Sequence, residues 1–169
     1  MSELVKTTRT GFQMPVLIYP AGALSPVISQ ATVEVHYGKH LQTYVDNLNR
    51  LAHGNEYEGM SLREIVRQAP EGPLLDNAGQ VLNHALYFEQ FTPLTKANNL
   101  PSGTLLSAIR FDFGNFDTMR QKMQDACSAL FGSGWVWLSA DENGTLFITQ
   151  SSNAGNPLKD GLKPILTID

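Results

Sequence analysis

The sequence is poor in cysteine, because Cys127 is the one thiol among its 169 residues. A single cysteine can form neither an internal disulfide nor a thiolate metal cluster. Cys127 lies in a segment with helical spacing of apolar residues, where a cysteine usually behaves as a small buried hydrophobe. The cysteine content therefore excludes a disulfide scaffold, and any metal site must use other side chains.

Long apolar runs are also missing. The first residues, MSELVKTTRTGF, lack the apolar core of a signal peptide, and the stretch MPVLIYPAGAL is short and broken by two prolines. From these features we expect a cytoplasmic protein with no membrane partner.

Runs of lysine or arginine are missing too, and the formal net charge is −4 with a pI near 5.5. Such a charge balance argues against a nucleic-acid partner. The composition is 42% hydrophobic and 17% charged, which is typical of a globular protein that buries a core.

The N-terminal half reads as an extended arm followed by helices. Residues 13–30 carry three prolines among apolar residues, which predicts an arm lying on a core. Three segments with helical spacing follow, at residues 32–51, 61–69 and 77–91. The polar stretch 92–103 holds two prolines and predicts a linker. We therefore expect a helical-hairpin domain over residues 1–91.

The C-terminal half changes from helical spacing to strand spacing. Residues 104–114 predict one helix, and Asn115 can cap a second helix that continues to Gly132. WVWLSA and TLFITQ flank the turn-forming DENG, so residues 135–150 predict an antiparallel hairpin, and PILTID predicts a third strand. The predicted fold class is α+β: a helical hairpin domain, then a domain at 104–169 with helices and a three-stranded antiparallel sheet.

Two of the expected helices carry polar side chains at intervals of four residues. His36, His40 and Tyr44 form one stripe, and Gln80 and His84 form another. Histidines at this spacing are common on solvated faces. Two facing stripes could also satisfy each other's polar groups in a core, and imidazoles on facing helices are a usual way to build a metal site. Spacing alone leaves these interpretations open.

Four separated motifs resemble the iron/manganese superoxide dismutases. In chain order they are HYGKHLQTYVDNLN from His36, NAGQVLNHALYF from Asn77, FGSGWVWL from Phe131 and SSNAGNPL from Ser151. The resemblance implies a homodimer that converts superoxide to oxygen and hydrogen peroxide by redox cycling of one mononuclear metal ion per chain. Iron is the first choice, because Gln80 in GQVLNH resembles the iron-type arrangement, and manganese is the other candidate.

The resemblance implies three metal ligands in this sequence, namely His36, His84 and Asp169. Family members continue after that aspartate into a Trp-Glu-His-Ala-Tyr-Tyr stretch. Its histidine is a fourth ligand, and its glutamate links the two metal sites of a dimer. Because the sequence stops at Asp169, we expect the natural protein to continue with the missing ligand.

The resemblance also implies catalytic side chains beside the metal. Tyr44 and His40 would line the substrate channel, Gln80 would hydrogen-bond the metal-bound solvent, and Trp135 would pack against the site. A phenol and an amide can hold a bound hydroxide and relay protons without ligating the metal. Lys39 is the expected source of local positive charge that steers the anion.

Two other classes of function remain open. Two histidines and a carboxylate with open positions are also the ligand pattern of non-haem iron oxygenases. A truncated, non-enzymatic homologue with a structural or binding role is the second class. Leu41, Leu82 and Phe88 stand where many family members have histidine or tryptophan, and these apolar replacements bear on tuning of the site rather than on its identity.

Overall fold

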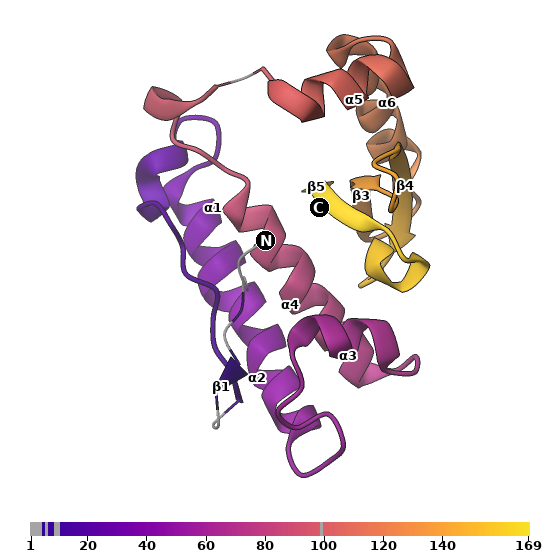
Figure 1. Cartoon of the computed structure of the whole chain (residues 1–169). Coiled ribbons are helices and arrows are strands. Elements are labelled where there is room, and N and C mark those ends of the chain that lie inside the picture. Colours follow the sequence, from indigo (N-terminus) through magenta and orange to yellow (C-terminus); the bar gives the residue numbers. More distant parts are fainter. Residues whose placement is uncertain (1–4, 6, 9–10, 99) are drawn as a thin grey trace. The chain divides into compact units, whose positions relative to one another are not determined.

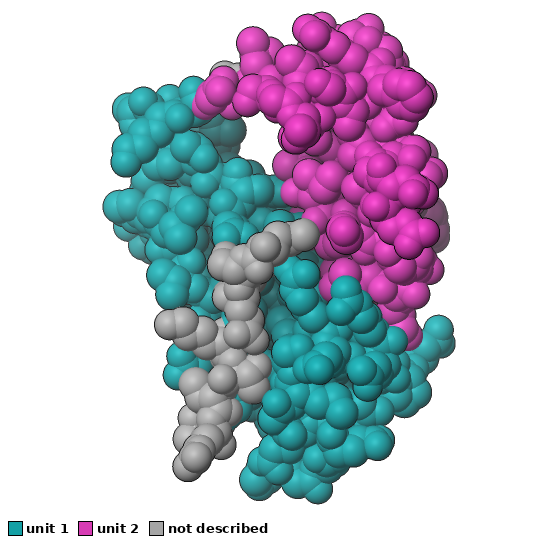
Figure 2. Space-filling model, viewed as in Figure 1, with its two compact units in different colours: residues 1–97 teal, residues 98–169 magenta. Residues whose placement is uncertain are grey.

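The chain forms two compact units, residues 1–97 and residues 98–169 (Figure 2). The computed structural model describes residues 5, 7–8, 11–98 and 100–169. Unit 1 is mainly helical, whereas unit 2 combines helices with a three-stranded sheet (Figure 1). The predicted α+β class is therefore confirmed.

Helices dominate unit 1, and capping residues mark where they begin. Ser29 and Ser61 accept hydrogen bonds from the backbone N–H groups of Thr32 and Glu64, and Glu64 completes a capping box with Ser61. The described elements are β1 (Thr7–Thr8), β2 (Gly11–Phe12), η1 (Ala21–Leu24), α1 (Gln30–Val35), η2 (His36–Leu41), α2 (Gln42–Ala52), α3 (Leu62–Gln68), α4 (Pro73–Glu89) and η3 (Leu94–Lys96).

Two predicted helices and the predicted arm of unit 1 differ from the structure. The helix expected at 32–51 begins at Gln30 and is interrupted by the π-helical segment η2. The helix expected from Asn77 begins at Pro73, because the missing N–H of proline costs nothing at the first helical position. The predicted arm at 13–30 is not extended throughout, since it contains the 3-10 turn η1.

The N-terminal arm is tied to the helices by side-chain hydrogen bonds. The backbone N–H of Phe12 donates to Asn49 Oδ1 at 2.7 Å, and Asn49 Nδ2 donates to the carbonyl of Phe12 at 2.9 Å. Tyr19 donates to the carbonyl of Phe88 at 2.9 Å, and Tyr37 donates to that of Pro15 at 2.5 Å. These bonds attach the arm to α2, η2 and α4.

The helices α2 and α4 pack antiparallel in unit 1 (Figure 1). The rings of Tyr37 and Phe88 lie 5.5 Å apart. The ring of Tyr44, which follows Tyr37 in the sequence, lies 5.6 Å from that of His84, which precedes Phe88, so the two segments run in opposite directions. Leu48 and Val81 are fully buried. Burying side chains of this size stabilises the fold by about 1.5 to 3 kcal/mol each.

Unit 2 contains the predicted hairpin and third strand. Its described elements are α5 (Gly103–Phe113), α6 (Phe116–Ala129), β3 (Gly134–Ala140), β4 (Leu146–Ser152), η4 (Pro157–Asp160) and β5 (Lys163–Ile168). The strand order is β4-β3-β5 with both pairs antiparallel, and Trp137 lies opposite Thr149 and Thr167. In the turn, Asp141 Oδ1 accepts from the backbone N–H groups of Asn143 and Thr145.

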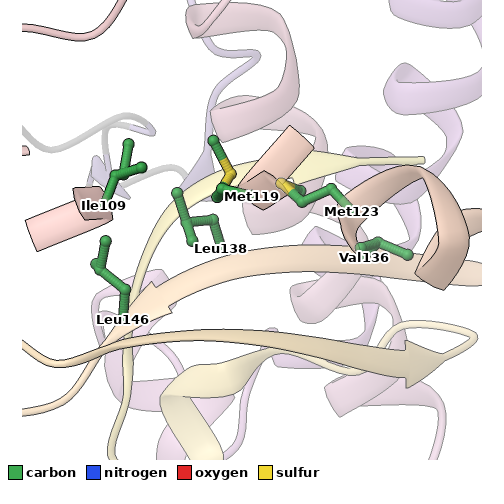
Figure 3. Close-up of a cluster of buried hydrophobic side chains, with 6 residues drawn as sticks. All are labelled: Ile109, Met119, Met123, Val136, Leu138 and Leu146. Carbon is green, nitrogen blue, oxygen red and sulfur yellow. The ribbon is translucent and has the colours of Figure 1, made fainter. Parts of the chain in front are cut away.

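An apolar cluster joins the helices of unit 2 to one face of its sheet (Figure 3). Its buried members come from α5, α6, β3 and β4, and they are Ile109, Met119, Met123, Val136, Leu138 and Leu146. Asn115 Oδ1 caps α6 by accepting from the N–H of Thr118, as predicted. Cys127 packs against this cluster as the small hydrophobe expected, but it is only partly buried. Burial raises the pKa of its thiol.

Candidate metal centre

The π-helical segment η2 contains both histidines of the first polar stripe. His36 opens the segment, and His40 follows one turn later. π-helical turns are rare and often occur at functional sites. Gly38, in the middle of the segment, weakens the α-helical preference by about 1 kcal/mol relative to alanine. The backbone therefore departs from α-helical geometry in the segment that carries His36 and His40.

His36 and His84 face each other across the helical hairpin of unit 1. Their Nε2 atoms are 3.0 Å apart, although the residues are 48 positions apart in the sequence. His84 is buried and His36 is half-buried. The two polar stripes thus meet through one histidine from each.

The backbone of α4 orients the ring of His84. His84 Nδ1 lies 2.8 Å from the carbonyl oxygen of Gln80. Because a carbonyl only accepts, Nδ1–H is the donor, and Nε2 of the neutral ring keeps its lone pair. Such a bond on the far nitrogen is the usual way in which proteins orient a metal-binding histidine. The lone pair of His84 Nε2 is thus directed toward His36.

His40 joins these two residues to form what we call the histidine cluster: His36, His40 and His84. One ring nitrogen from each lies within 4.8 Å of the others. The ring centroid of His40 is 5.6 Å from that of His36 and 5.3 Å from that of His84. His40 is the exposed member of the cluster. The remaining histidine, His53, is exposed and pairs with Glu58 outside the cluster.

Aromatic rings surround the cluster. The ring of Tyr44 lies 4.7 Å from that of His40 in a T-shaped contact. The rings of Tyr87 and Phe88 lie 5.4 and 5.2 Å from that of His36. Since Tyr44 and Tyr87 are half-buried and Phe88 is buried, the rings of His36 and His84 are screened from much of the solvent, whereas His40 stays exposed.

The structure brings together some of the expected site residues within unit 1. His36, His40, Tyr44 and His84 are neighbours, and the backbone of Gln80 contacts His84. The sequence did not predict that a ring nitrogen of His40 lies near those of His36 and His84. The interval of four residues between His36 and His40 is a signal that could have indicated it. The individual roles of these side chains stay predictions.

The other expected site residues belong to unit 2. Asp169 is exposed and follows β5 directly. Trp135 is buried on β3, opposite Ser151 of β4. The expected roles of the carboxylate and the indole beside the histidines stay predictions.

Two imidazoles and a carboxylate, the ligands expected from the sequence, would suit iron or manganese. Imidazole nitrogens suit iron, and carboxylates suit manganese. Two nitrogens that bind one ion at about 2.1 Å lie about 3.0 to 3.4 Å from each other in octahedral or tetrahedral geometry. The 3.0 Å between the Nε2 atoms of His36 and His84 agrees with that range.

Family models match both halves of the chain. The model for iron/manganese superoxide dismutases, alpha-hairpin domain, matches residues 11–92, and the model for the C-terminal domain matches residues 101–169. The chain therefore belongs to the iron/manganese superoxide dismutase family.

Several similar proteins are named as iron or manganese/iron superoxide dismutases. The chain is 54% identical over 158 residues to superoxide dismutase [Fe] of Bacteroides fragilis, a match covering 94% of this chain and 81% of that protein. It is 51% identical over 153 residues to superoxide dismutase [Mn/Fe] of Porphyromonas gingivalis, covering 90% and 78%. It is 46% identical over 158 residues to superoxide dismutase [Fe] of Escherichia coli K12, covering 94% and 80%.

Proposed function

We propose that this chain is a superoxide dismutase that uses iron, with manganese as the second candidate, at one ion per chain. The observation that carries the proposal is the 3.0 Å approach of His36 Nε2 to His84 Nε2 in a chain of this family. The reaction consumes two superoxide ions and two protons and yields one oxygen molecule and one hydrogen peroxide. The metal, when bound, supplies the one-electron oxidation of one superoxide and the one-electron reduction of the other.

His36, His84 and Asp169 hold the metal in this proposal. The bond from His84 Nδ1–H to the carbonyl of Gln80 supports the role of His84, because it leaves Nε2 as the ligand atom. The carboxylate of Asp169 adds the negative charge that a trivalent or divalent ion needs. A mixed nitrogen and oxygen set suits both iron and manganese.

Tyr44 and His40 deliver protons in this proposal. The T-shaped contact of their rings at 4.7 Å and the exposure of His40 support a path from solvent toward the metal. The side-chain amide of Gln80 holds a solvent molecule at the metal by a hydrogen bond, and so sets how readily that solvent takes up a proton. Both peroxide oxygens require protons, so these residues limit turnover.

Lys39 attracts superoxide to the site in this proposal. It is exposed and precedes His40 directly, on a chain whose formal net charge is −4. A local positive charge raises the rate at which a small anion reaches a site, and this effect weakens as salt is added.

The chain works as a cytoplasmic homodimer in this proposal, with neither nucleic acid nor membrane as partner. Among the described residues, no helix combines the length and apolarity needed to cross a bilayer.

Metal analysis together with a superoxide assay tests the proposed function. The purified full-length protein should contain iron or manganese near one per chain and should dismute superoxide. Metal content near zero would instead support a non-enzymatic homologue. Iron without dismutase activity, but with oxygen uptake on an organic substrate, would support non-haem iron oxygen chemistry.

A further inference from the structure

The histidine cluster offers more nitrogen ligands than the proposed redox centre uses. The proposed centre takes His36 and His84 together with Asp169, whereas His40 has only a proton-transfer role. We infer that His36, His40 and His84 also form a nitrogen-only site that binds a divalent ion such as zinc or cobalt without Asp169. This inference goes beyond the proposed function, because it requires no redox activity and no residue of unit 2.

The distances within the cluster suit such a site after a small movement of one ring. The His36 and His84 Nε2 atoms already lie 3.0 Å apart. The three ligand nitrogens lie within 4.8 Å of one another. Nitrogens that share one zinc ion at about 2.1 Å in a tetrahedral site lie about 3.4 Å apart, so the ligand nitrogen of His40 has to move by about 1.5 Å at most.

His40 is the member of the cluster that can make this movement. It is exposed, whereas His84 is buried and its ring is held by the Gln80 carbonyl. His36 and His40 are also four residues apart on one helical face, an interval at which paired histidines bind zinc in helical metal sites. His36 and His84 thus form one side of the site, and the exposed ring of His40 closes it.

The chemistry of three imidazoles determines which ions the site takes. Imidazole ligands suit zinc, copper, iron and nickel, whereas carboxylates are the preferred ligands of manganese, magnesium and calcium. Without Asp169 the site therefore favours zinc, copper, nickel and iron over manganese, magnesium and calcium. Three protein ligands and one open position are also the arrangement of catalytic zinc sites. Zinc held in this way occupies His36 and His84 and competes with iron for the chain.

Cobalt(II) titration of the metal-free full-length chain tests the inference. Cobalt substitutes for zinc and reports its ligand geometry through visible absorption. The Asp169→Ala chain should still bind one cobalt(II), and zinc(II) should displace it. Adding His40→Gln should weaken cobalt and zinc binding at least about tenfold, since even the loss of an outer hydrogen-bond partner costs about 10- to 100-fold in affinity.

His53→Gln in the same Asp169→Ala background is the matched control, because His53 lies in an exposed loop outside the cluster. It should leave cobalt affinity unchanged. Far-ultraviolet circular dichroism checks that each variant is folded. Proton NMR of the cobalt-loaded Asp169→Ala chain provides a second readout, because three shifted imidazole N–H signals are expected and His40→Gln should remove one.

Two results would overturn the inference. One is loss of all cobalt binding on Asp169→Ala alone, which means that the carboxylate is indispensable. The other is unchanged affinity and unchanged NMR signals on His40→Gln. Neither result depends on dismutase activity, which is measured separately on the iron-loaded chain. The failure of this inference and the failure of the proposed function are therefore distinguishable.

Discussion

The hairpin of unit 1 and the helix–sheet core of unit 2 bury different kinds of side chain. The α4 helix buries Asn83 and His84 at 0% and 1% exposure. The cluster between the helices and sheet of unit 2 is built from aliphatic side chains and methionines. A buried polar group costs free energy unless it is hydrogen-bonded, whereas apolar burial stabilises directly. Unit 2 also buries Ser139, Asn156 and Thr167, but outside this cluster. We therefore propose that the buried histidine of the hairpin belongs to the metal site, and that the apolar cluster of unit 2 serves stability.

Replacement of His84 is the change expected to have the largest effect. His84→Ala should remove a metal ligand, so that the iron content falls toward zero and dismutase activity falls at least about 100-fold, the upper end of what an outer partner costs. Elemental analysis and a superoxide assay measure both quantities. His53→Ala is the control, because it removes an exposed histidine outside the cluster. Full metal content in His84→Ala would show that His84 is not a metal ligand.

Replacement of Ile109 tests the other half of the comparison. Ile109→Ala removes a side chain that is 1% exposed and leaves a cavity in the apolar cluster. The free energy of unfolding should fall by about 2 to 5 kcal/mol. Urea denaturation measures this loss, and metal analysis of the folded protein should give the wild-type stoichiometry. If Ile109→Ala lost metal while its free energy of unfolding stayed at the wild-type value, the proposal that the apolar cluster of unit 2 serves stability would be wrong.

Replacement of Gln80 separates its backbone role from its side-chain role. Gln80→Leu keeps the carbonyl that accepts from His84 Nδ1–H, so the metal should stay bound. Turnover should fall at least about tenfold, because the amide that holds solvent at the metal is lost. Iron content and steady-state turnover are measured on the same sample. Wild-type turnover would contradict the proposed role of the amide.

Removal of the Tyr19 hydroxyl is expected to have the smallest effect. This hydroxyl links the arm to α4 by its bond to the Phe88 carbonyl. Burial raises its pKa to about 12 from the ordinary value of 10.0, with Tyr87 adding to the shift. Because the folded protein holds this proton more tightly than the unfolded chain, Tyr19 contributes stability that is fully present below pH 10 and is lost as pH rises through about 12.

Tyr19→Phe should therefore cost about 1 kcal/mol at pH 7 through loss of the bond to the Phe88 carbonyl. The difference between wild type and variant should shrink between about pH 10 and 12. Urea unfolding of both proteins across this range measures it. Tyr37→Phe provides a comparison, since the Tyr37 hydroxyl links the same two parts in the other direction, donating from η2 to the carbonyl of Pro15 in the arm. A difference that stays constant with pH would contradict the account.

Local signals in the sequence predicted much of the fold. Ser61 and Asn115 cap helices where their side chains can accept backbone N–H groups, and DENG forms the turn between β3 and β4. These features depend on neighbouring residues alone, so they can be read without the tertiary structure. The π-helical segment His36–Leu41 could not be predicted in this way, because residues 32–51 keep ordinary helical spacing.

The sequence by itself determined which elements form, which helices carry histidine at intervals of four, and to which family the motifs point. Only the tertiary structure decided that Nε2 of His36 meets Nε2 of His84 at 3.0 Å across 48 positions of chain, and that a ring nitrogen of His40 lies within 4.8 Å of them. The physical reason is that helical periodicity aligns side chains on one helix, whereas the meeting of two helices depends on how their apolar faces pack.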